Sequence, residues 1–183
     1  MSVTTRPITA EELYAMGELG RCELVKGEIV KMPPAGADHG EIAGVVFALI
    51  WNFVKPRKLG KVYAAETGFT IEREPDTTRA PDVGFVKNAR VPPRGKKGFF
   101  DGPPDLAVEV ISFNDLASEV SEKIEQWLAG GTVSVWVVDP RTRTIDVYRR
   151  GREVIRYRDN DELRDEPTLP GFVLKIAEVF ETE

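Results

Sequence analysis

The sequence predicts an α/β fold in which helices pack on a central mixed β-sheet. A strand–helix–strand unit spans Leu106 to Asp139, and its length of about thirty residues fits a parallel strand pair joined by a helix. Helical and strand-like patterns also alternate along the rest of the chain, as in mixed α/β proteins. The 183 residues, 42% of them hydrophobic, are enough for one domain with a sizeable core.

We therefore expect a single domain over residues 1–183. It would hold an N-terminal helix over about 9–17, a core over about 21–140, and a C-terminal hairpin and tail over about 141–183. In the first of these parts, Thr9 followed by Glu12 is a capping-box pattern, which begins a short helix ending near Gly17. In the second, "CELVKGEIVKM" has two strand-like runs around Lys26-Gly27, which favours a hairpin.

The middle of the chain is predicted from its spacing of apolar residues. From His39 to Val54 these residues recur every three or four positions, which indicates an amphipathic helix with a broad buried face. The next segments are predicted from their composition: strand–turn–strand over 61–72, a polar connection in "EPDTTRA", a short strand in "PDVGFV", and a mobile loop over 87–104, rich in proline, glycine and basic residues.

The last third of the chain is predicted in the same way. A strand over Leu106–Ile111 is followed by a helix whose apolar positions run from Leu116 to Leu128 and which ends at Gly130-Gly131. Three further segments follow: a buried strand in "VSVWVVD", a hairpin turning at Arg150-Gly151, and a closing strand or short helix in "PGFVLKIAEVF".

The charge balance limits the partners of the protein. The net charge of −5 gives no overall attraction to nucleic acid, so DNA binding would need a local basic patch. Two segments could provide one, and the alternative for both is a solvated face partly neutralised by Asp146, Glu153 and Asp159. Their basic residues are Arg90, Arg94, Lys96 and Lys97 in the loop, and Arg141, Arg143, Arg149, Arg150, Arg152, Arg156 and Arg158 in the hairpin.

The expected location is the cytoplasm. Cys22 is the only cysteine, so no internal disulfide can form, which suits a reducing compartment. The N-terminus "MSVTTRPITAEEL" has no apolar core of the signal-peptide type. The longest helix-like apolar stretch, from Ile42 to Val54, is too short and too polar to cross a bilayer, so we expect no membrane partner.

Glu109 interrupts an otherwise apolar strand, "LAVEVI". Burying a lone carboxylate costs several kcal/mol unless it is paired or bound to a cation, and strand propensity does not favour glutamate there. Asp82 stands at the start of another strand, where an aspartate after proline is most often a turn residue. If the two strands are neighbours, the carboxylates converge, and a hard divalent cation such as Mg²⁺ would relieve their repulsion.

Three further residues are weaker candidates. Lys123 lies beside the apolar stripe of its helix, and its spacing from Glu119 favours an exposed ion pair; alternatively, it reaches back to the two carboxylates. Glu23 lies in a strand next to a hairpin, where a solvent-facing acid is the ordinary explanation. His39, at a helix start, is more often a cap or surface residue than a ligand or base, although helix amides there attract anions.

Taken together, these motifs resemble a known family. The segments "ELVKGEIVKM", "DHGEIAGVV", "APDVGFV" and "PPDLAVEVIS", then Lys123, "VWVVDP" and "LPGFVLKIAEVF", occur in the order found in the Uma-type (Uma2) family of restriction-endonuclease-like proteins. That family belongs to the PD-(D/E)XK nuclease superfamily. The resemblance covers the chain from about Glu23 to Phe180, and its ordered combination of motifs is more specific than any one of them.

The resemblance implies a role for each candidate. Asp82 and Glu109 match the metal-binding acids. The usual superfamily lysine, two residues after the glutamate, is Ile111 here, and Lys123 matches the position to which this family has moved it. Glu23 and His39 match a glutamate and a histidine near the same cleft. The family also has a tyrosine one turn after the lysine, where this chain has a tryptophan at 127.

The implied function is hydrolysis of DNA phosphodiester bonds by a homodimeric endonuclease that uses Mg²⁺, with Mn²⁺ as a substitute. Three alternatives stay open. One is a catalytically silent DNA-binding or assembly module of the same fold. Another is a metal-dependent hydrolase of a small phosphate ester, which a closed pocket would support. The third is a structural domain in which Asp82 and Glu109 never meet.

Overall fold

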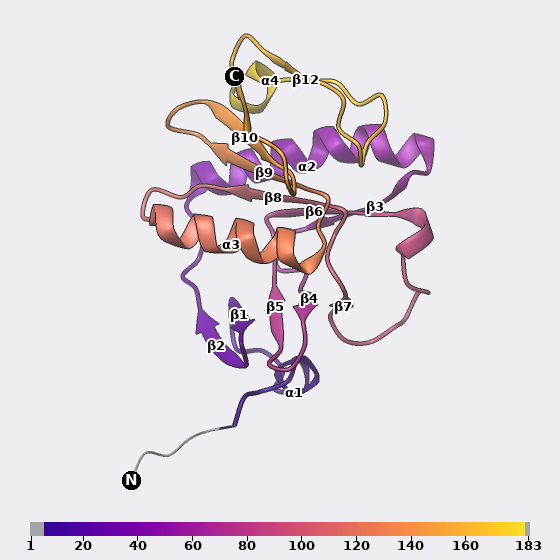
Figure 1. Ribbon diagram of the computed structural model, residues 1–183, viewed down its shortest axis with the longest axis vertical. Coiled ribbons are helices and arrows are strands. Elements are labelled where there is room, and N and C mark those ends of the chain that lie inside the picture. The colour runs from indigo at the N-terminus through magenta and orange to yellow at the C-terminus, as the bar shows by residue number, and fades with distance from the viewer. Residues whose placement is uncertain (1–5, 182–183) are drawn as a thin grey trace.

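The structure is a computed structural model that describes residues 6–181. It confirms the predicted class: mixed sheets are flanked by helices (Figure 1). The ends of the expected domain, residues 1–5 and 182–183, and the first residues of the N-terminal segment lie outside the described residues.

The strands form two main sheets rather than a single central one. The six-stranded sheet has the order β11-β10-β9-β8-β6-β3, and the five-stranded sheet has the order β2-β1-β5-β4-β7. The bounds of the first sheet are β3 Gly60–Ala64, β6 Val83–Lys87, β8 Leu106–Val110, β9 Ser134–Asp139, β10 Thr144–Tyr148 and β11 Ile155–Arg158. Those of the second are β1 Cys22–Val25, β2 Glu28–Lys31, β4 Phe69–Glu72, β5 Thr77–Arg79 and β7 Phe100–Asp101.

Two long helices cover opposite faces of the six-stranded sheet (Figure 1). Helix α2, Ala37–Arg57, packs in a core with Leu106, Val108 and Val110 of β8. Helix α3, Ala117–Gly130, packs in a second core that contains Ala107. Alternate residues of a strand point to opposite faces, so Glu109 lies on the α3 side. The strand is aliphatic toward α2 and admits its carboxylate only toward α3.

The predicted crossover and hairpins are present. Strands β8 and β9 are parallel and are joined by α3. Strands β1 and β2 form a hairpin, and Lys26 and Gly27 between them both have positive φ, 49° and 78°. This is the backbone that two-residue hairpin turns favour. The short helix α1, Ala10–Ala15, begins with the predicted capping box of Thr9 and Glu12.

Three segments differ from the prediction. The polar "EPDTTRA" contains strand β5, because its buried side chains find polar partners: Thr78 bonds Thr70 and Arg79 bonds Glu23. The expected mobile loop contains the 3₁₀ helix η1, Asn88–Arg90, and β7, which pairs with β4. Helix α2 begins before His39 and ends beyond Val54.

The C-terminal part lies over the α2 side of the six-stranded sheet (Figure 1). Its last segment, predicted as a strand or a short helix, contains one of each. Strand β12, Glu162–Leu163, pairs with β13, Leu174–Lys175, and helix α4, Ala177–Phe180, follows. Leu163, Leu174 and Val179 join the same core as α2.

Candidate active site

The two predicted metal-binding acids lie on paired strands. Strand β6 is antiparallel to β8, with Val83 opposite Val108, so the same register places Asp82 opposite Glu109. The amide of Val110 donates a hydrogen bond of 2.8 Å to Asp82 Oδ2. Both carboxylates are buried, at 7% and 8% exposed. The sequence alternative in which the two acids never meet is therefore wrong.

Glu109 is held by two residues of helix α3. Trp127 Nε1 donates a hydrogen bond of 2.7 Å to Glu109 Oε1, and Lys123 Nζ lies 3.5 Å from Oε2. Burial is the main reason that the pKa of Glu109 rises to about 7, with Asp82 and Glu23 adding to the rise, while Lys123 and Trp127 oppose it. The charge of Glu109 in turn raises the pKa of Lys123.

The position of Lys123 decides between its two sequence interpretations. Its ion pair is with Glu109, whereas the Glu119 carboxylate turns back to accept the amide hydrogen of Leu116, at 3.4 Å. Lys123 and Trp127 lie four residues apart on α3, one turn of the helix, so both reach the same carboxylate. The tryptophan at the tyrosine position thus supplies a donor to Glu109.

His39 joins the same cluster from the start of α2. Its Nε2 lies 3.1 Å from Asp82 Oδ2, and this contact raises the pKa of His39. Its Nδ1 is buried without a hydrogen-bond partner among residues 6–181. Both Asp82 contacts fall on Oδ2, so Oδ1 has no hydrogen-bond partner within the described part of the chain.

Glu23 is buried beside the cluster rather than facing solvent. Arg79 donates to Glu23 Oε2 over 2.5 Å, and the Ala80 amide donates to Oε1 over 3.0 Å. Arg79 also donates from Nε to Gln126 Oε1 on α3, at 2.7 Å. Sequence reasoning missed Arg79 and Gln126, because Arg79 lies in a segment predicted as a polar connection. A basic residue three positions before Asp82 was the only signal for it.

The two acids suit a hard divalent cation better than a soft one or one held by protein ligands alone. Among residues 6–181, no group of three or more His, Cys, Asp or Glu side chains is arranged to hold a metal ion. Mg²⁺, however, commonly takes one or two carboxylates and keeps several waters. Burial is the main cause of the high pKa of Glu109, and the charges of Asp82 and Glu23 add to it, so a cation at Asp82 and Glu109 would stabilise the ionised carboxylate.

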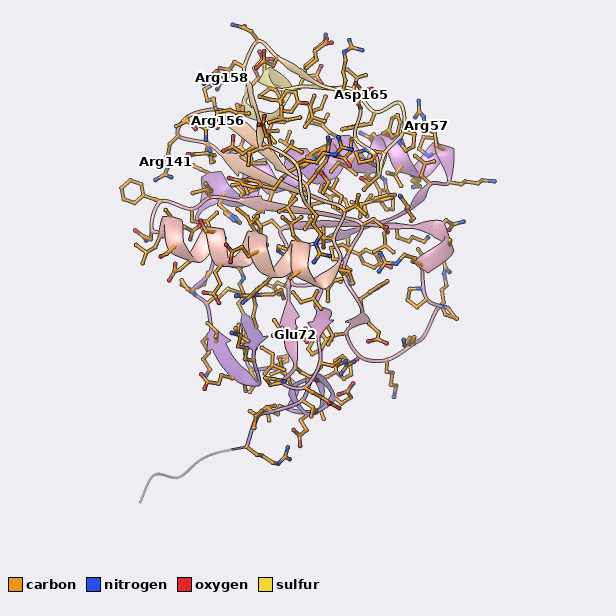
Figure 2. All side chains as sticks on the ribbon, viewed as in Figure 1. Arg57, Glu72, Arg141, Arg156, Arg158 and Asp165 are labelled. Carbon is orange, nitrogen blue, oxygen red and sulfur yellow. The ribbon has the colours of Figure 1, made fainter. Side chains whose placement is uncertain are left out.

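The basic side chains of the two segments are paired with acids to different extents. In the C-terminal hairpin, four of the seven arginines are paired with acids: Arg141 with Asp139, Arg143 with Asp159, Arg149 with Glu166, and Arg156 with Asp146. Figure 2 shows Arg141, Arg156 and Arg158 on the same side of that hairpin. In the loop, Arg90 pairs with Asp105. The loop residues Arg94, Lys96 and Lys97 form no ion pair with the residues that the structure describes.

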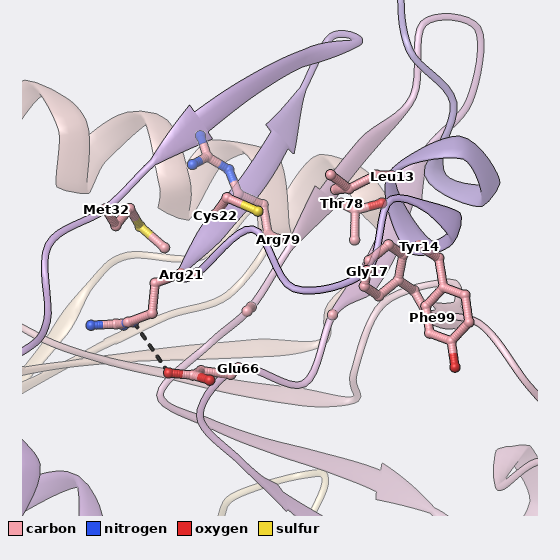
Figure 3. Close-up of a pocket in the computed structure, with 13 residues that line it drawn as sticks. Leu13, Tyr14, Gly17, Arg21, Cys22, Met32, Glu66, Thr78, Arg79 and Phe99 are labelled. Carbon is pink, nitrogen blue, oxygen red and sulfur yellow. Dashed lines mark ion pairs between the residues drawn. The ribbon is translucent and has the colours of Figure 1, made fainter.

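A pocket of about 170 Å³ lies beside α1, and its lining includes Arg79 and Ala80, which bond Glu23. Figure 3 shows Tyr14, Phe99 and the Arg21–Glu66 ion pair along it, with the Arg79 guanidinium directed away from the two aromatic rings. None of the five candidate residues lines it. The pocket therefore gives no support to hydrolysis of a small phosphate ester at the candidate site.

The fold and the cluster define a mixed α/β protein with two acids and a lysine on neighbouring elements. The model of the Uma2 family, described as "Putative restriction endonuclease", matches residues 10–177. The chain therefore belongs to the Uma2 family, and this membership supports a nuclease function. No helix within residues 6–181 is long and apolar enough to cross a membrane.

Several solved chains match this protein. One of them is described as a putative nuclease belonging to DUF820 from Anabaena variabilis ATCC 29413, and it matches with a TM-score of 0.81. The match has 23% sequence identity and covers 95% of this chain and 98% of that one. At this identity the likeness shows the shared fold alone. No curated protein matches the chain.

Proposed function

We propose that this protein is a Mg²⁺-dependent endonuclease that hydrolyses phosphodiester bonds in DNA. It would be of the PD-(D/E)XK type, with the lysine moved to helix α3. One observation carries the proposal: Asp82 and Glu109 lie on paired strands, and Lys123 lies 3.5 Å from Glu109. Membership of the Uma2 family supports the coarser part, nuclease function.

Asp82 and Glu109 would hold the metal, together with a backbone carbonyl near Val110 or Ile111. Carboxylate and carbonyl oxygens are the ligands that Mg²⁺ prefers, and Mn²⁺ would substitute. When bound, the ion supplies positive charge that lowers the pKa of water and polarises a phosphate oxygen.

Four further side chains would assist the reaction or orient the two acids. Lys123 would position the attacking water or stabilise negative charge that develops on the phosphate, as cationic donors aimed at a transition state do. Trp127 and His39 would orient the two acids, because each bonds a single carboxylate oxygen. Glu23, fixed by Arg79, would add negative charge near a second metal or orient water.

DNA would approach through the basic loop. Because four of the seven hairpin arginines are paired with acids, the loop residues Arg94, Lys96 and Lys97, which form no ion pair with the described residues, are the better candidates for phosphate contacts. Binding through them would weaken steeply with added salt. Cutting both strands would require two copies of the site, so we propose a homodimer, which sedimentation at several protein concentrations would reveal.

An assay on supercoiled and single-stranded DNA with Mg²⁺ or Mn²⁺ tests the proposal. The wild type should cut, and Glu109→Ala should lose both metal binding and cleavage. Lys123→Ala should still bind metal but cleave about 10²- to 10³-fold more slowly, whereas Lys175→Ala, at an exposed position of β13, should cleave normally. If the wild type neither binds metal in titration nor cuts DNA, the silent DNA-binding module is the better assignment.

A further inference from the structure

The two most exposed large hydrophobic side chains of residues 6–181 lie three positions apart in the chain. They are Phe113, 86% exposed, and Leu116, 59% exposed. Both belong to the segment 111–116, which we call the apolar loop. This loop joins β8, which carries Glu109, to α3, which carries Lys123. Single exposed apolar residues are ordinary on a protein surface. Here, however, the two residues with the largest exposed fractions lie within four positions of each other and next to the candidate site.

The apolar loop is held in shape by its own polar groups. Asp115 Oδ2 accepts a hydrogen bond of 2.8 Å from the Ser112 amide, and the Asp115 amide donates to the Ser112 carbonyl oxygen over 3.2 Å. Glu119 accepts from the Leu116 amide. The exposed phenyl ring is thus presented on an ordered turn, which reduces the entropy lost when it binds a partner.

The chemistry of the loop suits a base better than a phosphate. No lysine or arginine occurs from Ile111 to Glu122, so these side chains offer no cation to a phosphate. What the loop presents is an aromatic face and a branched aliphatic side chain. Aromatic side chains stack on nucleobases, and Phe and Leu are among the residues that insert between base steps.

The apolar loop also lies close enough to the acids for one DNA strand to contact both. Phe113 lies four positions after Glu109 in the chain, so their backbones are at most about 14 Å apart. This is about four times the 3.4 Å rise per nucleotide of a DNA strand. A DNA strand with its phosphate at Glu109 would therefore pass the loop within a few nucleotides.

We propose that Phe113, backed by Leu116, stacks on a nucleobase of the DNA close to the scissile phosphate. The proposal rests on the function proposed above and deepens it. Inserting the ring requires a base to leave its stack, so the protein would favour DNA that unstacks readily, such as single strands, mispaired sites or flexible pyrimidine–purine steps.

The test uses Glu109→Gln as the parent, so that DNA is bound without being cut. Binding to a duplex with 2-aminopurine near its centre is measured by fluorescence across a salt series. Phe113→Ala should weaken binding about tenfold and remove the 2-aminopurine signal, with an unchanged salt slope because no phosphate contact is lost. Phe113→Trp should restore both, and Val173→Ala, at another exposed apolar position, should match the parent.

The outcomes separate the two proposals. If the parent binds DNA and Phe113→Ala binds it equally well, or loses affinity with a smaller salt slope, the stacking proposal fails and the nuclease proposal stands. If wild type and parent bind no DNA at low salt, both proposals fail. Since Phe113 is exposed to water, its truncation should leave the fold intact, and unchanged circular dichroism checks this.

Discussion

Trp127 donates the hydrogen of its indole Nε1 to Glu109 Oε1 over 2.7 Å, across the contact between α3 and β8. This bond joins the helix that carries Lys123 to the strand that carries the acid. It also stabilises the ionised form of Glu109, against the burial that raises its pKa to about 7. The following predictions depend on this cluster of buried charges.

Trp127→Phe should raise the pKa of Glu109 further, because the ionised carboxylate loses its donor. Loss of the bond should also lower the free energy of unfolding by about 1–3 kcal/mol. Trp136→Phe is the matched control, since Trp136 Nε1 bonds the buried Glu166 over 3.1 Å. Urea unfolding should show both losses, but only Trp127→Phe should shift the pH midpoint of Mg²⁺ binding upward. Equal midpoints in both variants would contradict the role of Trp127.

Without divalent ions, Glu109 should make the protein less stable as the pH rises from about 4.5 to about 7. A carboxyl with a raised pKa binds more protons in the folded than in the unfolded state over this range, so stability falls with rising pH. The contribution is roughly 3 kcal/mol for a shift from the ordinary value to about 7.

Chemical denaturation in EDTA at several pH values, compared between wild type and Glu109→Gln, measures this effect. The difference between the two should grow from pH 5 to pH 8 and shrink when Mg²⁺ is added, because the ion takes the place of the proton. A difference that does not vary with pH would mean that Glu109 titrates at its ordinary value.

His39, the only histidine, should titrate above its ordinary pKa because Asp82 holds its Nε2. This raised pKa adds stability that is fully present below the unfolded value of about 6.5 and is lost as the pH rises through the folded pKa. One imidazole Cε1–H signal in an NMR titration reports the pKa directly. Asp82→Asn should lower it, and an unchanged titration would refute the contact.

Arg79→Met should lower the free energy of unfolding by about 3–5 kcal/mol, because it leaves the buried Glu23 carboxylate without its cation. Adding Glu23→Gln should recover part of that loss, since no buried charge then lacks a partner. The control is Arg164→Met, which breaks an ion pair with Glu162 whose arginine side chain is exposed. This variant should lower the free energy of unfolding by at most about 1 kcal/mol. Similar losses for Arg79→Met alone and for the double variant would show that the two residues are not coupled.

Local patterns predicted most of the fold. The helix around Ile50 follows from apolar spacing, the β1–β2 hairpin from Lys26-Gly27, and the parallel crossover from its length. Strand β5 was missed, because its threonines and arginine are polar and yet buried. Polarity indicates exposure only when a side chain has no internal partner, and a partner remote in the chain leaves no local pattern.

The sequence by itself determined the fold class, the family resemblance and the choice of Glu109 as a candidate site residue, since a carboxylate inside an apolar strand is a local anomaly. Only the tertiary structure decided its partners. Trp127 is 18 residues from Glu109, and Arg79 is 56 from Glu23. These contacts depend on strand order and on which face of the sheet each helix covers. Such features follow from packing the whole chain, because a side chain's spacing along the sequence does not fix its neighbours in space.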